Sequence, residues 1–510
     1  MLAKTNSCTL LGIEGYAVEV EVDISLGLPE FHLVGLPDTA VREAKDRVRA
    51  AIKNSGFTFP SQRITVNLAP ADIRKEGSMF DLAIAMGILA ASGEISQDKL
   101  NGLFFLGELS LDGSLRSVNG ILPLASSLNP KECRHLFVPA ANAVEAALAN
   151  NVSVFGVDSL TDLVLFCKGE KELVPVDVKR TDQLALGKKS NYSEDFADVR
   201  GQESAKRALE IAAAGNHNVL LYGPPGSGKT MLARRLSTIL PSMSLEESLE
   251  VTKIYSVAGL LPSDSPLIME RPFRSPHHSA TAAGIVGGGR IPRPGEVSLA
   301  HNGVLFLDEF PEYSRQVLET LRQPLEDKIV TITRANASIS YPCNFTLVAA
   351  MNPCPCGNYG NPFKECSCTP TQIKKYNQKA SGPLVDRIDL QIEVPSLEID
   401  KINKLSRGEP SAVIRSRVED CRRLQRERYK GTATTANGNM NAQQLKKYCS
   451  LSKDAEKLLF SAFKHYGLSM RGRTKLLKVA RTIADLEGET KICSHHIGEA
   501  IHYRCLDKHF

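Results

Sequence analysis

The sequence predicts an α/β protein of several domains, and three observations lead to this prediction. Strand and helix patterns alternate from the N-terminus to about Phe166. Further along, a glycine-rich loop joins a short apolar strand to a helix, as in a buried parallel sheet covered by helices. Beyond Pro395 the chain becomes helical and strongly charged. With 510 residues, of which 42% are hydrophobic and 23% charged, the chain suits two to four domains with sizeable cores.

The first domain is expected over residues 1–168. A strand opens it, because four apolar residues alternate with three acidic ones at the period-two spacing of a half-buried strand. A helix with Gly56 as its C-cap follows, and a second strand is expected near residues 64–68. The residues that define the first strand are Val18, Val20, Val22 and Ile24, alternating with Glu19, Glu21 and Asp23.

The location of the protein is read from what the sequence lacks. Its most apolar stretch, residues 82–93, is too short to span a bilayer and predicts a buried helix. The N-terminal residues have no apolar core of the kind that a signal peptide needs. The net charge of +5 is small for this length, so it neither requires nor excludes a nucleic-acid partner. We therefore expect a cytoplasmic protein that does not enter a membrane.

Two further domains follow a linker. Residues 169–195 are polar and charged with little periodicity, which predicts the linker. The second domain is expected over residues 196–395, where short apolar strands belong to a mostly parallel sheet. The third is a smaller α-helical domain over residues 396–510.

A phosphate-binding loop occupies residues 223–230, between a strand and a helix. Its sequence, GPPGSGKT, fits the pattern G-x-x-x-x-G-K-[ST] in full. Glycines let backbone N–H groups turn toward phosphates, and the helix N-terminus adds favourable dipole charge. Lys229 is expected to reach the β- and γ-phosphates of ATP, and the Thr230 hydroxyl to ligate Mg²⁺. The residues expected to bind the nucleotide are Gly223, Pro224, Pro225, Gly226, Ser227, Gly228, Lys229 and Thr230.

Two carboxylates follow the apolar strand at residues 304–307. Asp308 is expected to ligate the same Mg²⁺, and Glu309 to act as general base toward the attacking water. An acidic pair after a strand is by itself usually a solvated strand end. A phosphate loop earlier in the same domain favours the catalytic interpretation.

Together these motifs resemble the AAA+ superfamily of ring-forming ATPases, and the resemblance implies further catalytic residues. Asn352 stands where such proteins place the polar sensor that orients the attacking water. Arg387, in the segment SGPLVDRID, resembles the arginine finger that reaches the γ-phosphate held by a neighbouring subunit. Arg471 resembles the lid sensor that contacts nucleotide in the same subunit, with Arg473 as a close alternative. A surface ion pair is the alternative for each arginine.

Two insertions in this domain carry candidate DNA contacts. The first lies within residues 271–295 and is rich in glycine and proline. The second is a hairpin expected over residues 329–339. In ring motors that resemble this chain, such insertions point into the central pore, where basic tips would contact phosphates without reading sequence. Solvated loops with ordinary surface arginines are the equal alternative, and the adjacent His277 and His278 are assigned no role. The candidate contacts are Arg290, Arg293, Arg334 and Asn336.

A cysteine cluster follows the sensor asparagine. Its two C-x-C pairs are separated by nine residues that include Gly357, Gly360 and Pro362, which let the chain fold back. Four thiolates at this spacing predict a structural tetrahedral Zn²⁺ site, and reduced free thiols are the alternative. The four expected ligands are Cys354, Cys356, Cys366 and Cys368.

Several long segments resemble the ComM/YifB family of magnesium-chelatase-like AAA+ ATPases, over essentially the whole chain. They are GIEGYAVEVEVDISLGLPEFHLVGLPD, SPHHSATAAGIVGGG, MNPCPCG and SGPLVDRIDL. The resemblance implies a homo-hexameric DNA helicase or translocase that promotes branch migration of recombination intermediates in natural transformation. It also implies single-stranded and branched DNA, and a recombinase, as partners.

The N-terminal domain of this family is similar to the proteolytic domain of Lon, which uses a Ser–Lys pair. Met79 stands at the position of the serine, and Leu122 at the position of the lysine. A shifted alignment would bring Ser78 to the first position, but no lysine partner follows it. A thioether and an isobutyl group supply no nucleophile, so the resemblance implies a protease fold without protease activity.

Two other functions stay open at this stage. One is a chelatase-type motor that inserts Mg²⁺ into a porphyrin through a partner subunit, and the other is an ATP-dependent protease or protein-remodelling ATPase. The cysteine cluster and the Lon-like domain have no obvious use in metal insertion, and the missing dyad disfavours proteolysis. Stimulation of ATP hydrolysis by DNA, by protoporphyrin or by unfolded protein would separate the three.

Overall fold

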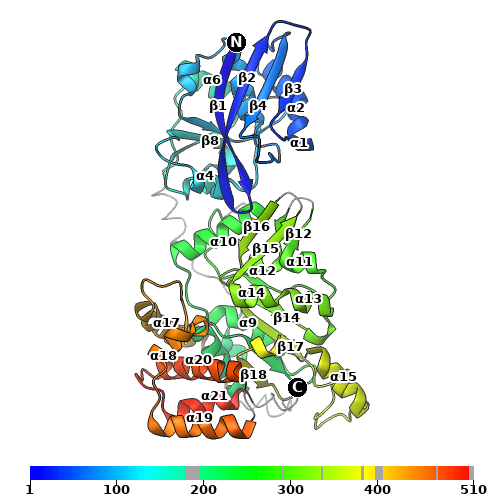
Figure 1. Cartoon of the computed structure of the whole chain (residues 1–510), viewed down its shortest axis with the longest axis vertical. Helices are drawn as coiled ribbons and strands as arrows, with labels where there is room; N and C mark the ends of the chain where they lie inside the picture. The colour runs from blue at the N-terminus through cyan, green and yellow to red at the C-terminus, as the bar shows by residue number, and fades with distance from the viewer. Residues whose placement is uncertain are drawn as a thin grey trace. The chain divides into compact units, whose positions relative to one another are not determined.

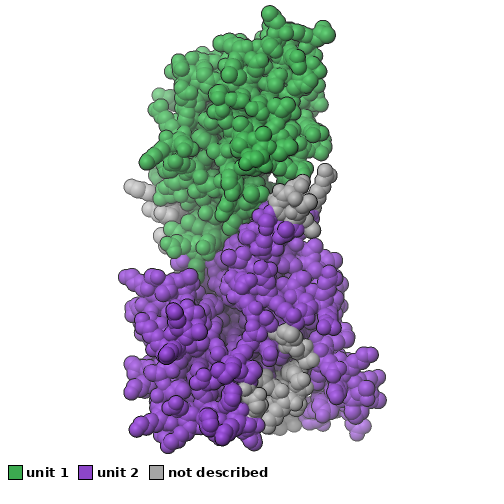
Figure 2. All heavy atoms as spheres, in the orientation of Figure 1, with its two compact units in different colours: residues 1–189, 245–268 green, residues 190–244, 269–510 purple. Residues whose placement is uncertain are grey.

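The computed structural model describes residues 1–177, 194–262, 265–289, 292–334, 337–380, 384–396, 406–466 and 469–504 (Figure 1). The chain forms two compact units, coloured separately in Figure 2. Unit 1 comprises Met1–Lys189 and Leu245–Ile268, and unit 2 comprises Ser190–Ser244 and Met269–Phe510.

Unit 1 is built on a seven-stranded mixed sheet with the strand order β3-β4-β2-β1-β5-β8-β9. The β1–β2 and β2–β4 pairs are antiparallel, and the other pairs are parallel. The alternation that predicts the first strand places Val18, Val20 and Val22 in the core. The strands are β1 (Leu2–Leu11), β2 (Glu14–Ser25), β3 (Phe31–Val34), β4 (Arg63–Ala69), β5 (Leu103–Phe105), β8 (His135–Pro139) and β9 (Ser153–Val157), with a separate small pair β6 (Glu108–Leu109) and β7 (Leu115–Arg116).

The helices of unit 1 pack against this sheet. The apolar stretch near residue 82 is helix α3, which is buried along its whole length and packs on β1 and β2. The C-cap of α2 is Ser55, and Gly56 follows it at the C′ position with a φ of 82°, a left-handed conformation that favours glycine. The helices are α1 (Thr39–Arg42), α2 (Ala44–Asn54), α3 (Asp81–Ala91), η1 (Gln97–Leu100), α4 (Ile121–Ser127), α5 (Ala140–Ala147) and α6 (Leu160–Lys168).

One further helix of unit 1 comes from much later in the chain. Helix α10 (Leu245–Ala258) packs against α4, and the Ser256 carbonyl accepts a hydrogen bond from the backbone N–H of Gly120 at 3.1 Å. From the sequence, this segment is expected to belong to the continuous domain 196–395. Nothing in the local pattern of α10 signals which unit it joins, because that depends on side chains more than a hundred residues away.

Unit 2 is built on a five-stranded sheet with the order β11-β14-β17-β10-β18, in which every pair is parallel. All residues of β10, β14 and β17 are buried, as expected for strands covered on both faces. The strands are β10 (Val219–Tyr222), β11 (Phe273–Arg274), β14 (Val304–Leu307), β17 (Thr346–Met351) and β18 (Leu390–Glu393).

Two antiparallel pairs extend from unit 2 beside its parallel sheet. They are β12 (Gly287–Gly288) with β13 (Arg293–Pro294), and β15 (Ile329–Arg334) with β16 (Ala337–Pro342). The Tyr341 hydroxyl donates to the Pro292 carbonyl at 2.9 Å, which joins the two pairs. The second pair forms the hairpin that the sequence predicts.

The helices of unit 2 fall into two groups along the chain. The first group is η2 (Phe196–Asp198), α8 (Glu203–Gly215), α9 (Lys229–Ile239), α11 (Ala282–Val286), α12 (Glu296–Leu299), η3 (Phe310–Glu312), α13 (Arg315–Thr320), α14 (Arg322–Asp327), α15 (Pro370–Ala380) and η4 (Val385–Arg387). The second group is the C-terminal helical region, which packs on α8 and α9 and consists of α17 (Ser411–Arg428), η5 (Asn437–Asn439), α18 (Ala442–Tyr448), α19 (Lys453–Tyr466), α20 (Met470–Leu486) and α21 (Ser494–His502). Across the described part of the chain, no helix has both the length and the apolar character needed to cross a bilayer.

Candidate nucleotide site and cysteine cluster

The glycine-rich loop leaves the carboxyl end of β10 and leads into α9. Gly226 and Gly228 have φ values of 75° and 92°, which favour glycine. At Gly223 a Cβ atom would lie 2.1 Å from the Val394 carbonyl oxygen, so only glycine fits there. The Ser227 hydroxyl is buried and has no hydrogen-bond partner among the described residues. The loop therefore has the backbone geometry of a phosphate cradle.

Lys229 lies folded back into this loop. Its ammonium group donates to the carbonyls of Gly223 and Pro224, at 2.7 and 2.8 Å, and to Asn352 Oδ1 at 3.1 Å. Burial lowers the pKa of Lys229 to about 8, against the opposing effect of Asp308. A polyphosphate would restore the preference for the charged form, because it brings negative charge to the ammonium group.

Thr230 and Asp308 form a second contact within the site. The Thr230 hydroxyl donates to Asp308 Oδ2 at 2.8 Å, and the other carboxylate oxygen accepts from the backbone N–H of Glu309 at 2.9 Å. A hydroxyl and a carboxylate oxygen are hard ligands of the kind that hold Mg²⁺ together with substrate phosphates. The two residues therefore fit the ion that the sequence predicts.

The sheet topology explains why these residues meet. Gly223, Asp308 and Asn352 each come directly after a strand, and β14, β17 and β10 are adjacent and parallel. Their carboxyl ends lie at one edge of the sheet, the usual ligand edge of such folds. Hydrogen bonds join Lys229 to Asn352 and Thr230 to Asp308, so four of the predicted residues form one cluster.

Glu309 stands beside this cluster in a strained backbone conformation. Its φ and ψ are 50° and 45°, a left-handed conformation that is uncommon outside glycine. Its carboxylate lies 3.2 Å from Nδ1 of His278. No role is predicted for His278 from the sequence. The only sequence signal for this contact is the His–His pair itself, which does not indicate its partner.

Arg387 and Arg471 lie elsewhere in unit 2 and meet at one carboxylate. Arg387 Nη2 is 2.7 Å from Glu326 Oε1, and Arg471 Nη2 is paired with the same oxygen. Arg387 precedes β18, whereas Gly223 follows β10, and these strands are parallel with Leu390 opposite Val219. A strand of four residues spans ~13 Å, so the arginines lie at the amino edge of the sheet, opposite to the phosphate loop.

A buried charged cluster holds the segment that carries Arg387. The Asp389 carboxylate accepts from the backbone N–H of Asn218 at 2.9 Å and pairs with Lys475 at 3.1 Å. Burial alone would raise the pKa of Asp389, but Lys475 and His217 outweigh it and hold that pKa far below its ordinary value. Burial also lowers the pKa of Lys475 to about 8. The cluster ties α20, which includes Arg471, to the start of β18.

The four predicted cysteines converge. Their sulfur atoms all lie within 4.8 Å of one another, and three of the separations are 3.4, 3.6 and 3.6 Å. A tetrahedral zinc site with Zn–S bonds of ~2.3 Å requires sulfur separations of about 3.8 Å. The backbone N–H of Asn358 lowers the pKa of Cys356, whereas the neighbouring Cys354 and Cys356 raise the pKa values of Cys366 and Cys368. A bound cation would neutralise the negative charge that these thiols otherwise share. The residues therefore fit a Zn²⁺ ion.

The cysteine loop also contacts the phosphate loop. Gly357 has a φ of 79°, and a Cβ atom at this position would lie 2.5 Å from Pro225. The loop begins immediately after Asn352. Whatever holds the four cysteines together therefore supports two parts of the nucleotide site at once.

A second group with metal-ligand chemistry lies in the C-terminal helices. Glu487 Oε2 is bonded to Nε2 of His495 and of His496, at 2.9 and 3.0 Å. The backbone N–H of Cys493 donates to Nδ1 of His496 at 2.8 Å. The proton of neutral His496 therefore belongs on Nε2, where a metal would have to replace it. This arrangement favours a hydrogen-bonded helix cap over a metal site.

The predicted DNA contacts are described only in part. Arg293 is exposed in β13, and Arg334 ends β15. Arg290 and Asn336, and the side chain of Arg334, lie outside the described residues. The two strand pairs that carry them contact each other, as described above.

Unit 1 offers no comparable cluster at the predicted protease positions. Met79 precedes α3 and is nearly buried, and Leu122 is buried in α4. The Ser78 hydroxyl is hydrogen-bonded to the Glu108 carboxylate. Lys75 is buried with its ammonium group against the Pro70 carbonyl, and burial lowers its pKa.

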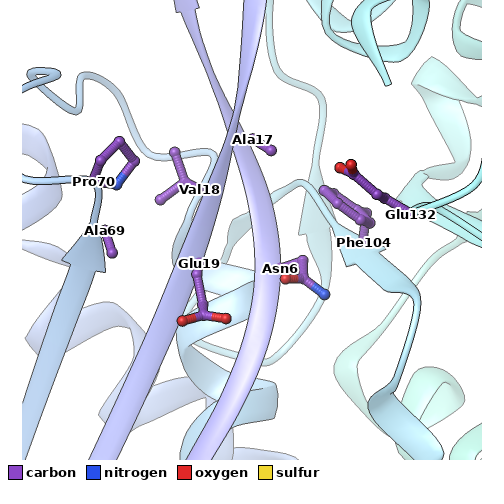
Figure 3. Close-up of a pocket in the computed structure, with 8 residues that line it drawn as sticks. All are labelled: Asn6, Ala17, Val18, Glu19, Ala69, Pro70, Phe104 and Glu132. Atoms are coloured by element: carbon purple, nitrogen blue, oxygen red, sulfur yellow. The ribbon is translucent and has the colours of Figure 1, made fainter. Parts of the chain in front are cut away.

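An open hollow of about 430 Å³ lies on the sheet of unit 1 (Figure 3). Figure 3 shows Ala69 and Pro70 on one side of the paired strands, and Phe104 and Glu132 on the other. The charged groups that line the hollow are the carboxylates of Glu19 and Glu132, and they do not suit an anionic ligand. The lining residues are Asn6, Ala17, Val18, Glu19, Ala69, Pro70, Phe104 and Glu132.

Family models of magnesium chelatase match three segments of the chain. The model described as magnesium chelatase, subunit ChlI, matches residues 195–402. A model of subunit ChlI of Mg-chelatase matches residues 20–142, and one of the ChlI C-terminal region matches residues 408–504. Together the three models cover parts of both units.

Individual relatives match over the full length. Competence protein ComM of Haemophilus influenzae is 45% identical over 508 residues, which is 99% of this chain and 98% of ComM. The protein YifB of Salmonella typhimurium is 44% identical over 510 residues, with the same coverage of each chain. Lon protease 2 of Bacillus subtilis is 32% identical over 150 residues, which is 28% of this chain and 26% of the protease.

Proposed function

The chain belongs to the ComM/YifB family of magnesium-chelatase-like AAA+ proteins, and from this premise we propose that it is an ATP-driven DNA motor that works as a homo-hexameric ring. The single observation that carries the ring is the separation of two sets of catalytic side chains. One set surrounds the phosphate loop, and the other lies at the opposite edge of the same sheet.

The first set binds and hydrolyses ATP. The backbone N–H groups and Lys229 hold the phosphates, and Thr230 and Asp308 hold Mg²⁺. When bound, that ion neutralises charge on the β- and γ-phosphates. Glu309 removes a proton from the attacking water and Asn352 orients that water. The contacts among Lys229, Asn352, Thr230 and Asp308 support these roles.

The second set completes the site of a neighbouring subunit. Arg387 cannot reach its own phosphate loop across the ~13 Å length of the strand with a side chain of about half that length. Arg471 meets Arg387 at Glu326, so one γ-phosphate oxygen in place of Glu326 Oε1 would contact both. We therefore propose that Arg471 acts between subunits together with Arg387. This replaces the expectation that Arg471 contacts nucleotide within its own subunit.

DNA is the proposed substrate of the motor. One full-length relative is a competence protein, and competence is the capacity to take up DNA. The strand pairs β12–β13 and β15–β16 carry Arg293 and Arg334, with Arg290 and Asn336 next to them in sequence. Such arginines suit sequence-independent phosphate contacts. We propose translocation on single-stranded and branched DNA that promotes branch migration, with a recombinase as partner, in the cytoplasm of a transformable cell.

A chelatase-type motor subunit is the second candidate. The family models that match the chain are those of subunit ChlI of magnesium chelatase. The four converging cysteines and the Lon-like N-terminal segment have no evident use in inserting Mg²⁺ into a tetrapyrrole.

The remaining parts support the motor. We propose that Cys354, Cys356, Cys366 and Cys368 hold a structural Zn²⁺ ion that fixes the loop against Pro225. We propose further that residues 1–168 form a Lon-like domain without protease activity, because Met79 and Leu122 supply neither nucleophile nor base. Residues 169–195 would then be the linker to the ATPase core at 196–395, of which Leu245–Ile268 packs within unit 1, and the lid would comprise residues 396–510.

Hydrolysis of ATP with and without single-stranded DNA tests the proposal. We expect stimulation by DNA in the wild type, and loss of hydrolysis in Lys229→Ala, Glu309→Gln and Arg387→Ala. Hydrolysis that does not respond to DNA would refute the DNA motor and leave the ATPase. In that case stimulation by protoporphyrin or by unfolded protein becomes the relevant measurement.

A further inference from the structure

Glu326 lies where the two arginines of the proposed interface meet. Its Oε1 atom is 2.7 Å from Arg387 Nη2 and is also paired with Arg471 Nη2. The side chain of Arg387 is largely covered, with 13% exposed, but those of Glu326 and Arg471 are 43% and 46% exposed, so the shared carboxylate lies at the surface of unit 2. Solvent and a second protein chain can therefore reach it.

The charges at this point favour an anion with more charge than one carboxylate. Two guanidinium groups that share one oxygen repel each other, and Glu326 supplies a single negative charge between them. A terminal phosphate carries more charge and three oxygens, and arginine binds phosphate in a fork geometry. Ion pairs at exposed positions contribute little net free energy, so an incoming phosphate can replace the carboxylate.

Glu326 is also joined closely to the β15–β16 hairpin. Helix α14 ends at Asp327, and Lys328 follows in a left-handed conformation with a φ of 58°. The N–H of Lys328 donates to the Pro324 carbonyl at 3.1 Å, and its carbonyl accepts from the N–H of Cys343 at 2.9 Å. Strand β15 begins at the next residue. A displacement of the end of α14 is therefore transmitted to the base of the hairpin.

We propose that Glu326 is the positioning residue through which the nucleotide of a neighbouring copy of this chain controls the β15–β16 hairpin. In an isolated subunit the Glu326 carboxylate is paired with Arg387 and Arg471. In the ring the γ-phosphate bound to the neighbour takes over both arginines and releases Glu326 and the end of α14. The inference rests on the proposed function, because it requires both a ring and a DNA contact on the hairpin.

The variant Glu326→Gln tests this role, because the amide keeps the shape of the side chain without its charge. We measure ring assembly against the concentration of a slowly hydrolysed ATP analogue, and DNA stimulation of ATP hydrolysis in assembled rings. We expect half-maximal assembly at an analogue concentration that is lower by up to about fivefold, which corresponds to the ~1 kcal/mol upper end for exposed ion pairs. We also expect at least half of the DNA stimulation to be lost.

Glu319→Gln is the matched control. Glu319 lies in the preceding helix α13, pairs with Arg322 at 2.6 Å and is similarly exposed, but it does not join the two arginines. We expect it to behave as the wild type in both measurements. In an Arg387→Ala, Arg471→Ala background, Glu326→Gln should leave assembly unchanged, whereas a purely structural effect of Glu326 would persist.

The outcomes separate this inference from the proposed function. If ATP hydrolysis by the wild type is not stimulated by DNA, or if Arg387→Ala does not reduce hydrolysis, the proposed function fails. If both dependences hold and Glu326→Gln assembles like the wild type, the role of Glu326 is refuted. If assembly shifts while DNA stimulation stays at the wild-type level, the link to the hairpin is refuted.

Discussion

Raising the pH should weaken nucleotide binding through Lys229. Burial holds the pKa of this lysine at about 8 in the free protein, below its ordinary value of 10.5. Phosphate oxygens favour the charged ammonium, so the pKa rises when nucleotide binds and a proton is taken up above pH 8. The affinity for nucleotide is therefore highest below pH 8 and decreases as the pH rises above that value.

The magnitude follows from the fraction of charged lysine. At pH 9.5 a group with a pKa of about 8 is charged in roughly one molecule in thirty, against nine in ten at pH 7. We therefore expect the Kd for MgATP to rise about 30-fold between pH 7 and pH 9.5, which corresponds to ~2 kcal/mol.

Titration with a fluorescent ATP analogue over this pH range measures the effect. Lys229→Ala serves as the reference, because its residual binding reports every other group that titrates. Calorimetry in buffers of different ionisation enthalpy should detect proton uptake near pH 9. A wild-type Kd that is constant between pH 7 and pH 9.5 would show that Lys229 keeps its ordinary pKa, and the reasoning from burial would be refuted.

Three further predictions concern the support of the site. Purified protein should contain one Zn²⁺ per chain by elemental analysis, and Cys366→Ser should remove it and reduce ATP hydrolysis; full hydrolysis in a metal-free protein would contradict the structural role. Gly357→Ala should lower ATP affinity, because its Cβ would lie 2.5 Å from Pro225, whereas Gly360→Ala has a similar φ with open space and should bind like the wild type. Equal loss in both would point to backbone strain alone. Asp389→Asn should destabilise unit 2 by about 3–5 kcal/mol in urea unfolding, because Lys475 and His217 lose their buried partner. The exposed Asp386→Asn is its control, and equal unfolding midpoints would contradict the argument.

The parts of the site that the sequence predicts are those that depend on a short contiguous motif. Residues 223–230 contain the strand end, the glycines and the helix start together, so the loop geometry is local. Asp308 is identified because it follows an apolar strand, and Asn352 because it resembles the polar sensor that AAA+ proteins place at the end of such a strand. In a parallel sheet the carboxyl ends of neighbouring strands meet, which brings these residues together without further information.

The contacts that the sequence does not predict are those between distant side chains. Glu326 is one acidic residue among 57 Asp and Glu, and only the folded chain brings it to Arg387 and Arg471. The resemblance implies that Arg471 contacts the nucleotide of its own subunit. The sequence near Arg471 contains no signal for the edge of the sheet at which helix α20 places this residue. The same holds for α10, which joins unit 1 although its neighbours in sequence belong to unit 2.

Mixing of subunits tests the central claim, that arginines of one chain complete the ATP site of the next. Lys229→Ala has a phosphate loop that does not support hydrolysis but keeps both arginines, and Arg471→Ala keeps its phosphate loop but lacks one arginine. Each alone should be nearly inactive. In a randomly mixed ring, about a quarter of the interfaces join an intact phosphate loop to an intact Arg471, so about a quarter of the wild-type hydrolysis should return. A mixture no more active than the average of its two components would contradict the account.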